Sequence, residues 1–142
     1  LARQVLLEKK PGKKILRELL AVHKSYSRNV LALMQKIQVN GIVHITGGGF
    51  VENIPRILPK GIGVLIDKSA WEVPEIFQAI QKKGKVSEGE MFRVFNMGIG
   101  LILVVKKNDS KKALDFLVKQ KEKAFLIGKA INESEGRVLF HG

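Results

Sequence analysis

The chain has 142 residues, 45% of them hydrophobic and 27% charged, and no apolar run approaches the roughly 18 residues of a membrane span, so we expect a soluble globular domain. Cysteine is absent, which excludes disulfides and thiolate chemistry and fits a cytoplasmic protein. The net charge of +12 would suit a polyanion, but the basic residues come as scattered pairs and only 6% of residues are aromatic, which disfavours nucleic acid as a partner.

Apolar residues recur at helical or strand spacing along most of the chain. Leu1, Val5 and Leu6 share one helical face, so the chain opens inside an element, as a piece of a longer protein would. Ser25 is a suitable N-cap for the helix after it, and Ser87 forms a capping box with the glutamate three residues later. In chain order we expect further helices over residues 13–22, 25–37, 50–58, 73–82, 88–95 and 110–120, and strands over 41–46, 62–66, 99–105, 124–131 and 136–141.

This order of elements predicts the α/β class. Residues 99–105 are apolar without alternation, which is typical of a central strand covered on both faces. Pro55 must lie near the first turn of the 50–58 helix, because a proline farther along would break it. We therefore expect an α/β fold with α+β character, in which a single-layer mixed sheet is flanked by helices within one domain over residues 1–142.

The most informative stretch is the run from His44 to Gly49, which reads His-Ile-Thr-Gly-Gly-Gly at the end of a predicted strand. Strand alternation puts His44 and Thr46 on the same face. The glycines allow a sharp bend and a close ligand, and the free N–H groups of the helix that follows favour an anion such as phosphate. The run lacks the Gly-Lys-Ser/Thr of a Walker A loop. A plain strand-to-helix turn with a structural His44 and no ligand is the alternative.

A second cluster of polar residues lies on the predicted helix after Ser87. Glu90, Arg93 and Asn96 recur every three residues, near one face of that helix, and Gly98 suits its exit. Arg93 could clamp a phosphate with two hydrogen bonds, or Glu90 could simply cap the helix and pair with Arg93. The three histidines are isolated and no acidic pair suggests magnesium, so we expect no metal site in this chain.

Several segments are recognisable when they are taken together in their order. They are the run from Gly41 to Pro59, the runs Trp71–Phe77 and Glu90–Gly100, and the closing residues 123–138. Together they resemble the C-terminal domain of AIR synthetase, the phosphoribosylformylglycinamidine cyclo-ligase family, over nearly the whole chain. The chain departs from the family where it has Ala21-Val-His-Lys in place of the usual Thr-Pro-Thr-Arg.

The resemblance implies a ligase of purine biosynthesis, a homodimer of two-domain subunits. ATP phosphorylates the formyl oxygen of formylglycinamidine ribonucleotide, an amidine nitrogen attacks, and phosphate leaves as the imidazole ring closes. ATP and Mg²⁺ would bind mainly to an N-terminal domain that is absent from this chain, so we expect the chain alone to be inactive. No catalytic residue is assigned. Carried over residue by residue, the positions that would face the substrate cleft are His44, Thr46, Gly47, Gly48, Gly49 and Asn53, with Glu90, Arg93, Asn96 and Gly98 as weaker candidates.

Three other functions remain open at this point. Formylglycinamidine ribonucleotide synthetase, selenophosphate synthetase, thiamine-phosphate kinase and the hydrogenase-maturation protein share the two-domain design, and the chain could belong to any of these ATP-dependent enzymes. It could also be a stand-alone basic module that binds anions or nucleic acid. The third alternative is a scaffold piece whose glycine loop only turns the chain.

Overall fold

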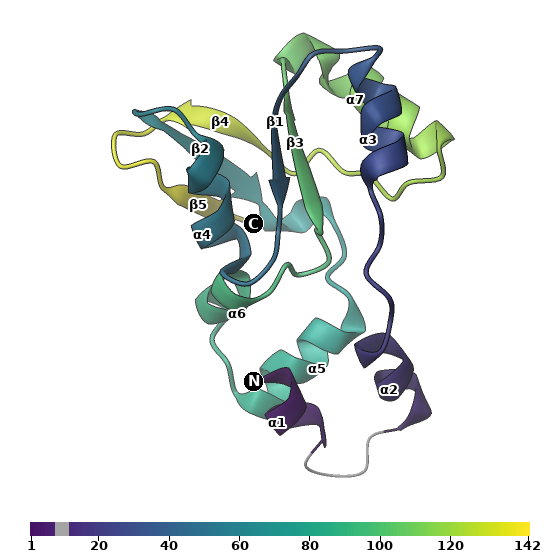
Figure 1. The fold of residues 1–142 in the computed structure, drawn as a ribbon. Helices are drawn as coiled ribbons and strands as arrows, with labels where there is room; N and C mark the ends of the chain where they lie inside the picture. The colour runs from purple at the N-terminus through teal and green to yellow at the C-terminus, as the bar shows by residue number, and fades with distance from the viewer. Residues whose placement is uncertain (8–11) are drawn as a thin grey trace.

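The computed structural model describes residues 1–7 and 12–142, apart from the side chain of Leu7. The described residues form seven α-helices and five strands, which Figure 1 shows. The helices are α1 (Ala2–Leu7), α2 (Lys13–Leu19), α3 (Ser27–Met34), α4 (Gly49–Asn53), α5 (Glu75–Gly84), α6 (Glu88–Val94) and α7 (Ser110–Lys119). The strands are β1 (Val39–His44), β2 (Ile62–Asp67), β3 (Leu101–Val105), β4 (Gly128–Asn132) and β5 (Val138–His141).

The strands form two small sheets. β1 pairs antiparallel with β3, while β2 lies between β4, to which it is antiparallel, and β5, to which it is parallel. The α/β class, the mixed pairing and the flanking helices confirm the expected fold, but the single sheet is divided in two. Buried residues of β1 and β2, such as Val43 and Val64, belong to one apolar cluster. The two sheets thus share a core instead of a hydrogen-bonded edge.

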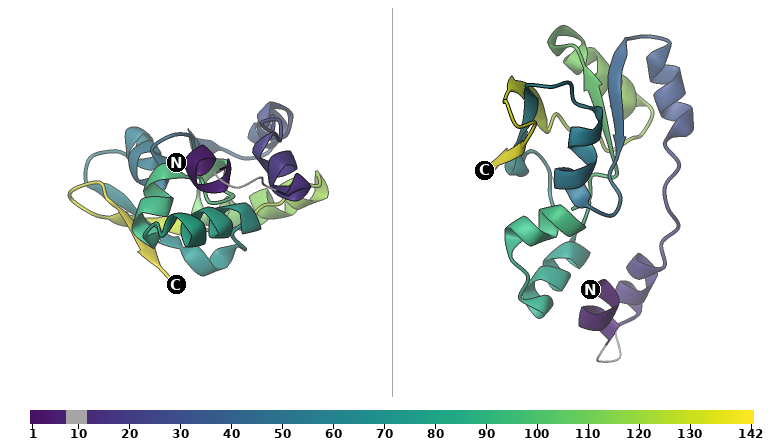
Figure 2. Two further views of the ribbon diagram at one scale, coloured as in Figure 1. Left: turned by 90° about the horizontal axis from the view of Figure 1, so that it is seen from below. Right: turned by 60° about the vertical axis from the view of Figure 1, so that its left-hand side comes forward.

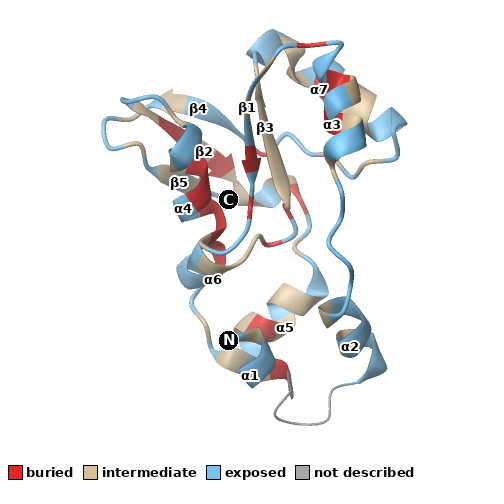
Figure 3. Cartoon of the chain, viewed as in Figure 1, coloured by how far each residue is buried: buried red, intermediate tan, exposed pale blue. Residues whose placement is uncertain are grey.

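The main core lies between the two sheets and continues under α4 and α6 (Figure 3). Aromatic side chains dominate its centre. Phe50 is completely buried, stacks on Trp71 with ring centroids 5.9 Å apart, and meets Phe92 edge-on at 5.5 Å. The helix α4, which follows the glycine loop, is therefore fixed to the core by its second residue.

A second, smaller core lies under α3 and α7. Leu33 and Ala113 are buried there against Leu103 and Val105 of β3, whereas Ile102 packs on the main core. β3 is thus covered on both faces, as the sequence predicts. It is not a central strand, however, because its partner in the sheet is β1 alone. This second core therefore packs the α3–α7 pair onto the β1–β3 sheet.

The helices α1, α2 and α5 gather at one end of the molecule, beyond the strands (Figures 1 and 2). α1 packs against α5, and Leu6 is buried between them and the core, which confirms the helical opening of the chain. An extended segment of residues 21–26 then runs from α2 to α3. This segment passes the end of β1, where the candidate site lies.

Several helix ends differ from the predicted ones; α2, for example, ends at Leu19 and not at residue 22. α3 begins at Ser27 after Tyr26, so the prediction of Ser25 as its N-cap is wrong. The predicted 50–58 helix is α-helical only to Asn53 and continues as a short 3₁₀-helix, Ile54–Ile57, in whose first turn Pro55 lies. Proline lacks the N–H that the α-helix would need, which explains the change. The Ser87 cap is confirmed, since its hydroxyl accepts a 3.3 Å hydrogen bond from the Glu90 N–H.

Candidate functional site

The end of β1 presents two polar side chains on one face. Val43 and Ile45 are 4% and 2% exposed, whereas His44 and Thr46 are exposed to solvent. This is the alternation that the sequence predicts for a strand with one buried face. His44 and Thr46 are therefore available to a ligand at the end of the strand, because the burial of their neighbours fixes the direction of the chain.

The glycine run turns the chain from β1 into α4 through two left-handed residues. The φ angles are +93° at Gly48 and +53° at Gly49, where residues with a side chain are strained. A Cβ at Gly49 would lie 2.8 Å from the carbonyl carbon of Arg93 and closer still to the carbonyl oxygen of Phe92. A Cβ at Gly47 would meet no atom within 4 Å. The loop is thus pressed onto α6 at one end and open at the other.

Asn53 holds this loop from inside. Its side chain is 4% exposed, and its amide nitrogen donates to the carbonyl oxygens of Gly47, at 3.1 Å, and Gly49, at 2.8 Å. The amide nitrogen faces the loop backbone and not solvent. Asn53 therefore fixes the shape of the glycine run, which supports His44 and Thr46 without placing the amide nitrogen on the exposed face.

One carboxylate and one guanidinium lie beside the glycine loop. A Cβ at Gly48 would lie 2.6 Å from Glu52 Oε2, and Glu52 Oε1 is 3.7 Å from Arg93 Nε. The sequence suggests a pairing of Arg93 with Glu90, and the structure instead gives Arg93 an ion pair with Glu52. Because both side chains are about half exposed or more, an anionic ligand could draw Arg93 away from Glu52 at little cost. The α4 helix has only five residues, so its dipole adds little to anion binding.

Asn96 and Gly98 form a tight turn after α6. The helix ends at Val94, so the prediction that Asn96 shares a helical face with Glu90 and Arg93 is wrong. Asn96 Oδ1 accepts a 3.0 Å hydrogen bond from the Gly98 N–H, and Gly98 has a φ of +99°. A Cβ at Gly98 would collide with the ring of Pro74, the residue before α5. The structural role of this turn is to join α6 to β3.

The two motifs that carry the resemblance meet in space. The Ile45 N–H donates to the carbonyl oxygen of Gly100 at 2.9 Å, and Gly49 contacts the last turn of α6. The glycine loop and residues 90–100 are therefore neighbours (Figures 1 and 2). Glu90 itself is exposed on the first turn of α6. Of the weaker candidates, Arg93 is the side chain that an ion pair brings to the loop.

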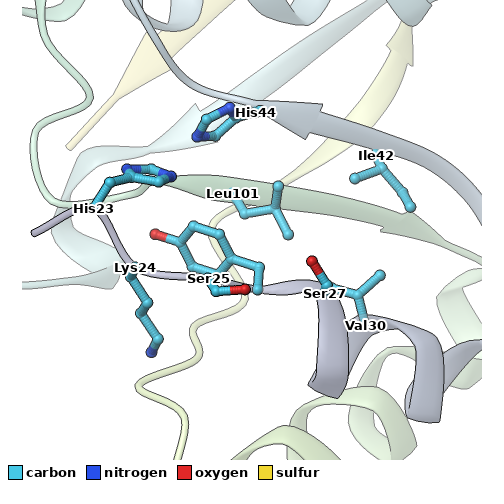
Figure 4. Close-up of a pocket in the computed structure, with 9 residues that line it drawn as sticks. His23, Lys24, Ser25, Ser27, Val30, Ile42, His44 and Leu101 are labelled. Atoms are coloured by element: carbon cyan, nitrogen blue, oxygen red, sulfur yellow. The ribbon is translucent and has the colours of Figure 1, made fainter.

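His44 also lines an open pocket of about 430 Å³ (Figure 4). The His44 ring centroid lies 4.9 Å from that of His23 and 6.4 Å from that of Tyr26. The hydroxyl of Tyr26 touches Gly100, where a side chain would have no room. Figure 4 shows the His23 and His44 rings side by side, with Lys24 pointing away from them. Sequence reasoning missed both His23 and Tyr26 as pocket residues, and its one signal was the departure from the family pattern at residues 21–24.

The segment that carries His23 is anchored to the end of α7. Lys24 Nζ forms an ion pair with Glu122 Oε2, and Asn29 Nδ2 donates to Glu122 Oε1 at 2.6 Å. The hydrogen bond from Lys24 is the main reason why the pKa of the Glu122 carboxyl lies below its ordinary value. The hydrogen bond from Asn29 also lowers this pKa, whereas the partial burial of the carboxyl raises it. The anchor is therefore strongest when Glu122 is ionised.

We expect residues 21–26 to loosen from α7 at acid pH. A lowered native pKa means that the stabilisation is complete above the ordinary glutamate pKa of about 4.3 and is lost as the pH falls through the native value. Amide hydrogen exchange of residues 23–26, measured between pH 7 and pH 3 and corrected for intrinsic rates, checks this. Glu122→Gln should make the protection of this segment low and independent of pH. Equal, pH-independent protection in both proteins would contradict the anchor.

The described residues hold neither a cluster of three metal-binding side chains nor a helix that could cross a membrane. Among residues 1–7 and 12–142, no three His, Asp or Glu side chains are placed to hold a metal ion together. Within the same part of the chain, no helix combines the length and the hydrophobicity that a membrane crossing requires.

Comparison with known proteins identifies the family. Residues 1–141 match the family described as "AIR synthase related protein, C-terminal domain". The chain belongs to this family. The AIR synthase resemblance of the glycine loop and of residues 90–100 is thereby confirmed over the whole chain.

Relatives of the AIR synthase family support this at the level of single sequences. The chain is 49% identical over 125 residues to the phosphoribosylformylglycinamidine cyclo-ligase of Bacillus cytotoxicus, an alignment that covers 88% of this chain and 35% of the relative. It is 47% identical to the enzyme of the same name from Bacillus pumilus, over 100% of this chain and 43% of that relative. The identity with the enzyme of Citrifermentans bemidjiense is 43%, over 96% of this chain and 42% of the relative. The chain thus spans less than half the length of these relatives.

A solved structure confirms the AIR synthase-related fold. The hydrogenase maturation protein HypE of E. coli superposes with a TM-score of 0.63, at 22% identity, over 89% of this chain and 40% of that one. At this identity the likeness concerns the fold alone.

Proposed function

We propose that the chain is the C-terminal part of a phosphoribosylformylglycinamidine cyclo-ligase, which closes the imidazole ring of formylglycinamidine ribonucleotide at the expense of ATP. The observation that carries the proposal is the exposed pair His44 and Thr46 on an open glycine loop, in a chain 43–49% identical to three relatives of that name.

In this proposal the chain binds and orients the substrate. The His44 imidazole and the Thr46 hydroxyl offer hydrogen bonds to the ribonucleotide, and the open backbone at Gly47 lets it approach closely. Arg93 is close enough to the loop to offer a positive charge to a phosphate. Asn53, Gly48 and Gly49 hold the loop in shape. Orientation of the formyl oxygen and the attacking nitrogen lowers the entropic cost of ring closure.

The remaining parts of the enzyme lie outside this chain in the proposal. ATP supplies the phosphoryl group that activates the formyl oxygen, and we assign ATP and Mg²⁺ mainly to an N-terminal domain, because the chain spans less than half the length of its relatives. The chain's partners are then that domain, the ribonucleotide and a second subunit of a cytoplasmic homodimer. Each subunit would have its substrate cleft between the two domains, with the His44 face of this chain as one wall.

A chimeric enzyme tests the proposal. The C-terminal part of the B. cytotoxicus relative is replaced by residues 1–142, and ADP formation is measured with formylglycinamidine ribonucleotide and ATP. We expect ATP-dependent, substrate-dependent turnover within about tenfold of the parent enzyme, because the replaced part is 49% identical to this chain over 125 residues. The N-terminal part alone and residues 1–142 alone serve as controls and should both be inactive. A chimera that is folded by circular dichroism but inactive, or turnover by the chain alone, would overturn the proposal.

A further inference from the structure

The pocket beside His44 has two walls that come from different parts of the chain (Figure 4). Residues 23–27, which lead into α3, form one wall, and residues of β1 and β3 form the other. Figure 4 shows His23 and His44 at one end and Ile42 at the other. The ring centroid of His23 lies 4.9 Å from that of His44 and 6.0 Å from that of Tyr26. The pocket is therefore polar at one end and apolar at the other.

Two contacts hold the wall of residues 23–27 in place. Lys24 forms an ion pair with Glu122, beyond the end of α7. The hydroxyl of Tyr26 lies against Gly100, where a Cβ would collide with it. Neither contact needs a ligand, so the wall is already formed when a ligand arrives and little ordering accompanies binding.

Side-chain hydrogen-bond donors line this pocket, and no carboxylate does. Besides Lys24, which points away and pairs with Glu122, five lining residues carry an N–H or O–H donor. They are His23, Ser25, Tyr26, Ser27 and His44. Within residues 1–7 and 12–142, none of these five side chains donates to another residue, and neither Asp nor Glu lines the pocket. Five available donors around one pocket without negative charge favour an anionic ligand.

A phosphate monoester matches this lining better than a carboxylate does. Its three terminal oxygens accept hydrogen bonds from several donors at once, whereas a carboxylate has two oxygens. The apolar end at Ile42 and Val30 then fits the carbon atoms of the group that carries the phosphate. The volume of about 430 Å³ lies near the lower end of the range for ligand pockets, roughly 300–1,000 Å³, which suits a pentose phosphate.

We propose that the His23–His44 pocket binds the phosphate group of a phosphorylated pentose. His23 and His44 donate to the phosphate oxygens from the two walls, and Tyr26 and the two serines add hydroxyl donors. The phosphate site depends on the pocket alone, whereas its occupation by formylglycinamidine ribonucleotide rests on the proposed function.

A phosphate in this pocket gives the ribonucleotide a direction on the β1 face. His44 belongs both to the pocket and to the exposed pair with Thr46, which is two residues nearer the glycine loop. The reacting formyl and amidine groups then lie towards Thr46 and the open backbone at Gly47. Arg93, which pairs with Glu52, is left for the phosphoryl group that ATP transfers.

Titration of residues 1–142 with ribose 5-phosphate, followed by the imidazole resonances in NMR spectra, tests the site. His141, on β5, is the third histidine of the chain and the internal control. We expect the His23 and His44 resonances to shift with a dissociation constant in the millimolar range, the His141 resonance to stay, and ribose without phosphate not to bind. His23→Ala should weaken ribose 5-phosphate binding at least about fivefold, and His141→Ala by less than about twofold.

Two further variants separate the contributions of His23 and Arg93. His23→Gln keeps an N–H donor without the ring, so we expect it and Arg93→Gln each to bind ribose 5-phosphate within about twofold of the parent chain. No saturable shift of His23, equal losses in His23→Ala and His141→Ala, or binding of ribose as tight as that of ribose 5-phosphate would each overturn the proposal. So would a loss in His23→Gln or Arg93→Gln as large as that in His23→Ala. Circular dichroism establishes that the variants are folded.

The chimeric enzyme keeps this proposal apart from the cyclo-ligase function. In an active chimera, His23→Ala should raise the KM for formylglycinamidine ribonucleotide about fivefold to tenfold and leave kcat nearly unchanged, because the phosphate is remote from the reacting atoms. An inactive chimera, with ribose 5-phosphate still bound by residues 1–142, would overturn the cyclo-ligase function alone. An active chimera whose KM does not change in His23→Ala would overturn the place of the ribonucleotide in this pocket and leave the cyclo-ligase function standing.

Discussion

Gly49→Ala should lower the free energy of unfolding by at least about 3 kcal/mol, the largest effect that we expect from the loss of a single glycine in this chain. Two causes act together. The φ angle of +53° is strained for alanine, and its Cβ would collide with the backbone of Phe92 and Arg93 in α6. Backbone atoms inside a packed helix cannot yield as a side chain can. The loop or α6 would have to move away, at the cost of the contact between them.

Gly47→Ala is the matched control for this prediction. A Cβ at Gly47 meets no atom within 4 Å, and its φ does not fall in the left-handed region. We expect an effect between no change and a gain of about 1 kcal/mol, because alanine restricts the unfolded chain. Urea denaturation followed by the fluorescence of Trp71, the one tryptophan, measures both variants. A similar loss in the two proteins would show that the contact with α6 is not what requires Gly49.

Phe50→Ala should destabilise the fold by about 3–5 kcal/mol. Phe50 is completely buried and contacts three other aromatic rings, including a near-parallel stack on Trp71 with an interplanar angle of 15°. Removing the ring leaves a cavity that the sheets on either side cannot fill without moving. The lost ring also held α4, and with it the glycine loop, against the core.

Val51→Ala, on the next residue of α4, is the control for this substitution. Val51 is 38% exposed, so we expect a loss of less than about 1 kcal/mol. Both variants are compared by urea denaturation with far-ultraviolet circular dichroism, since Phe50→Ala also changes the surroundings of Trp71. If Phe50→Ala cost no more than Val51→Ala, the aromatic cluster would not be the main support of the loop.

Local patterns in the sequence predict the candidate site better than they predict its surroundings. The outward direction of His44 and Thr46 follows from the two-residue period of a strand, and the Ser87 cap follows from a spacing of three residues. Pairing between distant strands has no such local signal. The sequence therefore does not predict the division of the strands into two sheets, and it favours Ser25 as a cap although the chain enters α3 at Ser27.

Contacts between distant segments explain the remaining differences. The approach of His23 to His44 depends on the path of residues 21–26, which Lys24 fixes through Glu122, almost a hundred residues later. Asn53 matches the family motif, but the motif alone does not tell a ligand contact from a brace. Its burial and its hydrogen bonds to the loop carbonyls show the bracing contacts, which no local pattern predicts.

The most direct test of the central claim is the kcat/KM of the B. cytotoxicus chimera with substitutions on the exposed face of β1. We predict that His44→Ala and Thr46→Ala each lower kcat/KM for formylglycinamidine ribonucleotide by about 10- to 100-fold, the effect of losing a hydrogen bond to a polar or charged substrate group. Asn40→Ala, at an exposed position on the same strand, should stay within about twofold of the parent chimera. An active chimera in which neither His44→Ala nor Thr46→Ala changes kcat/KM would contradict the claim that this face binds the substrate.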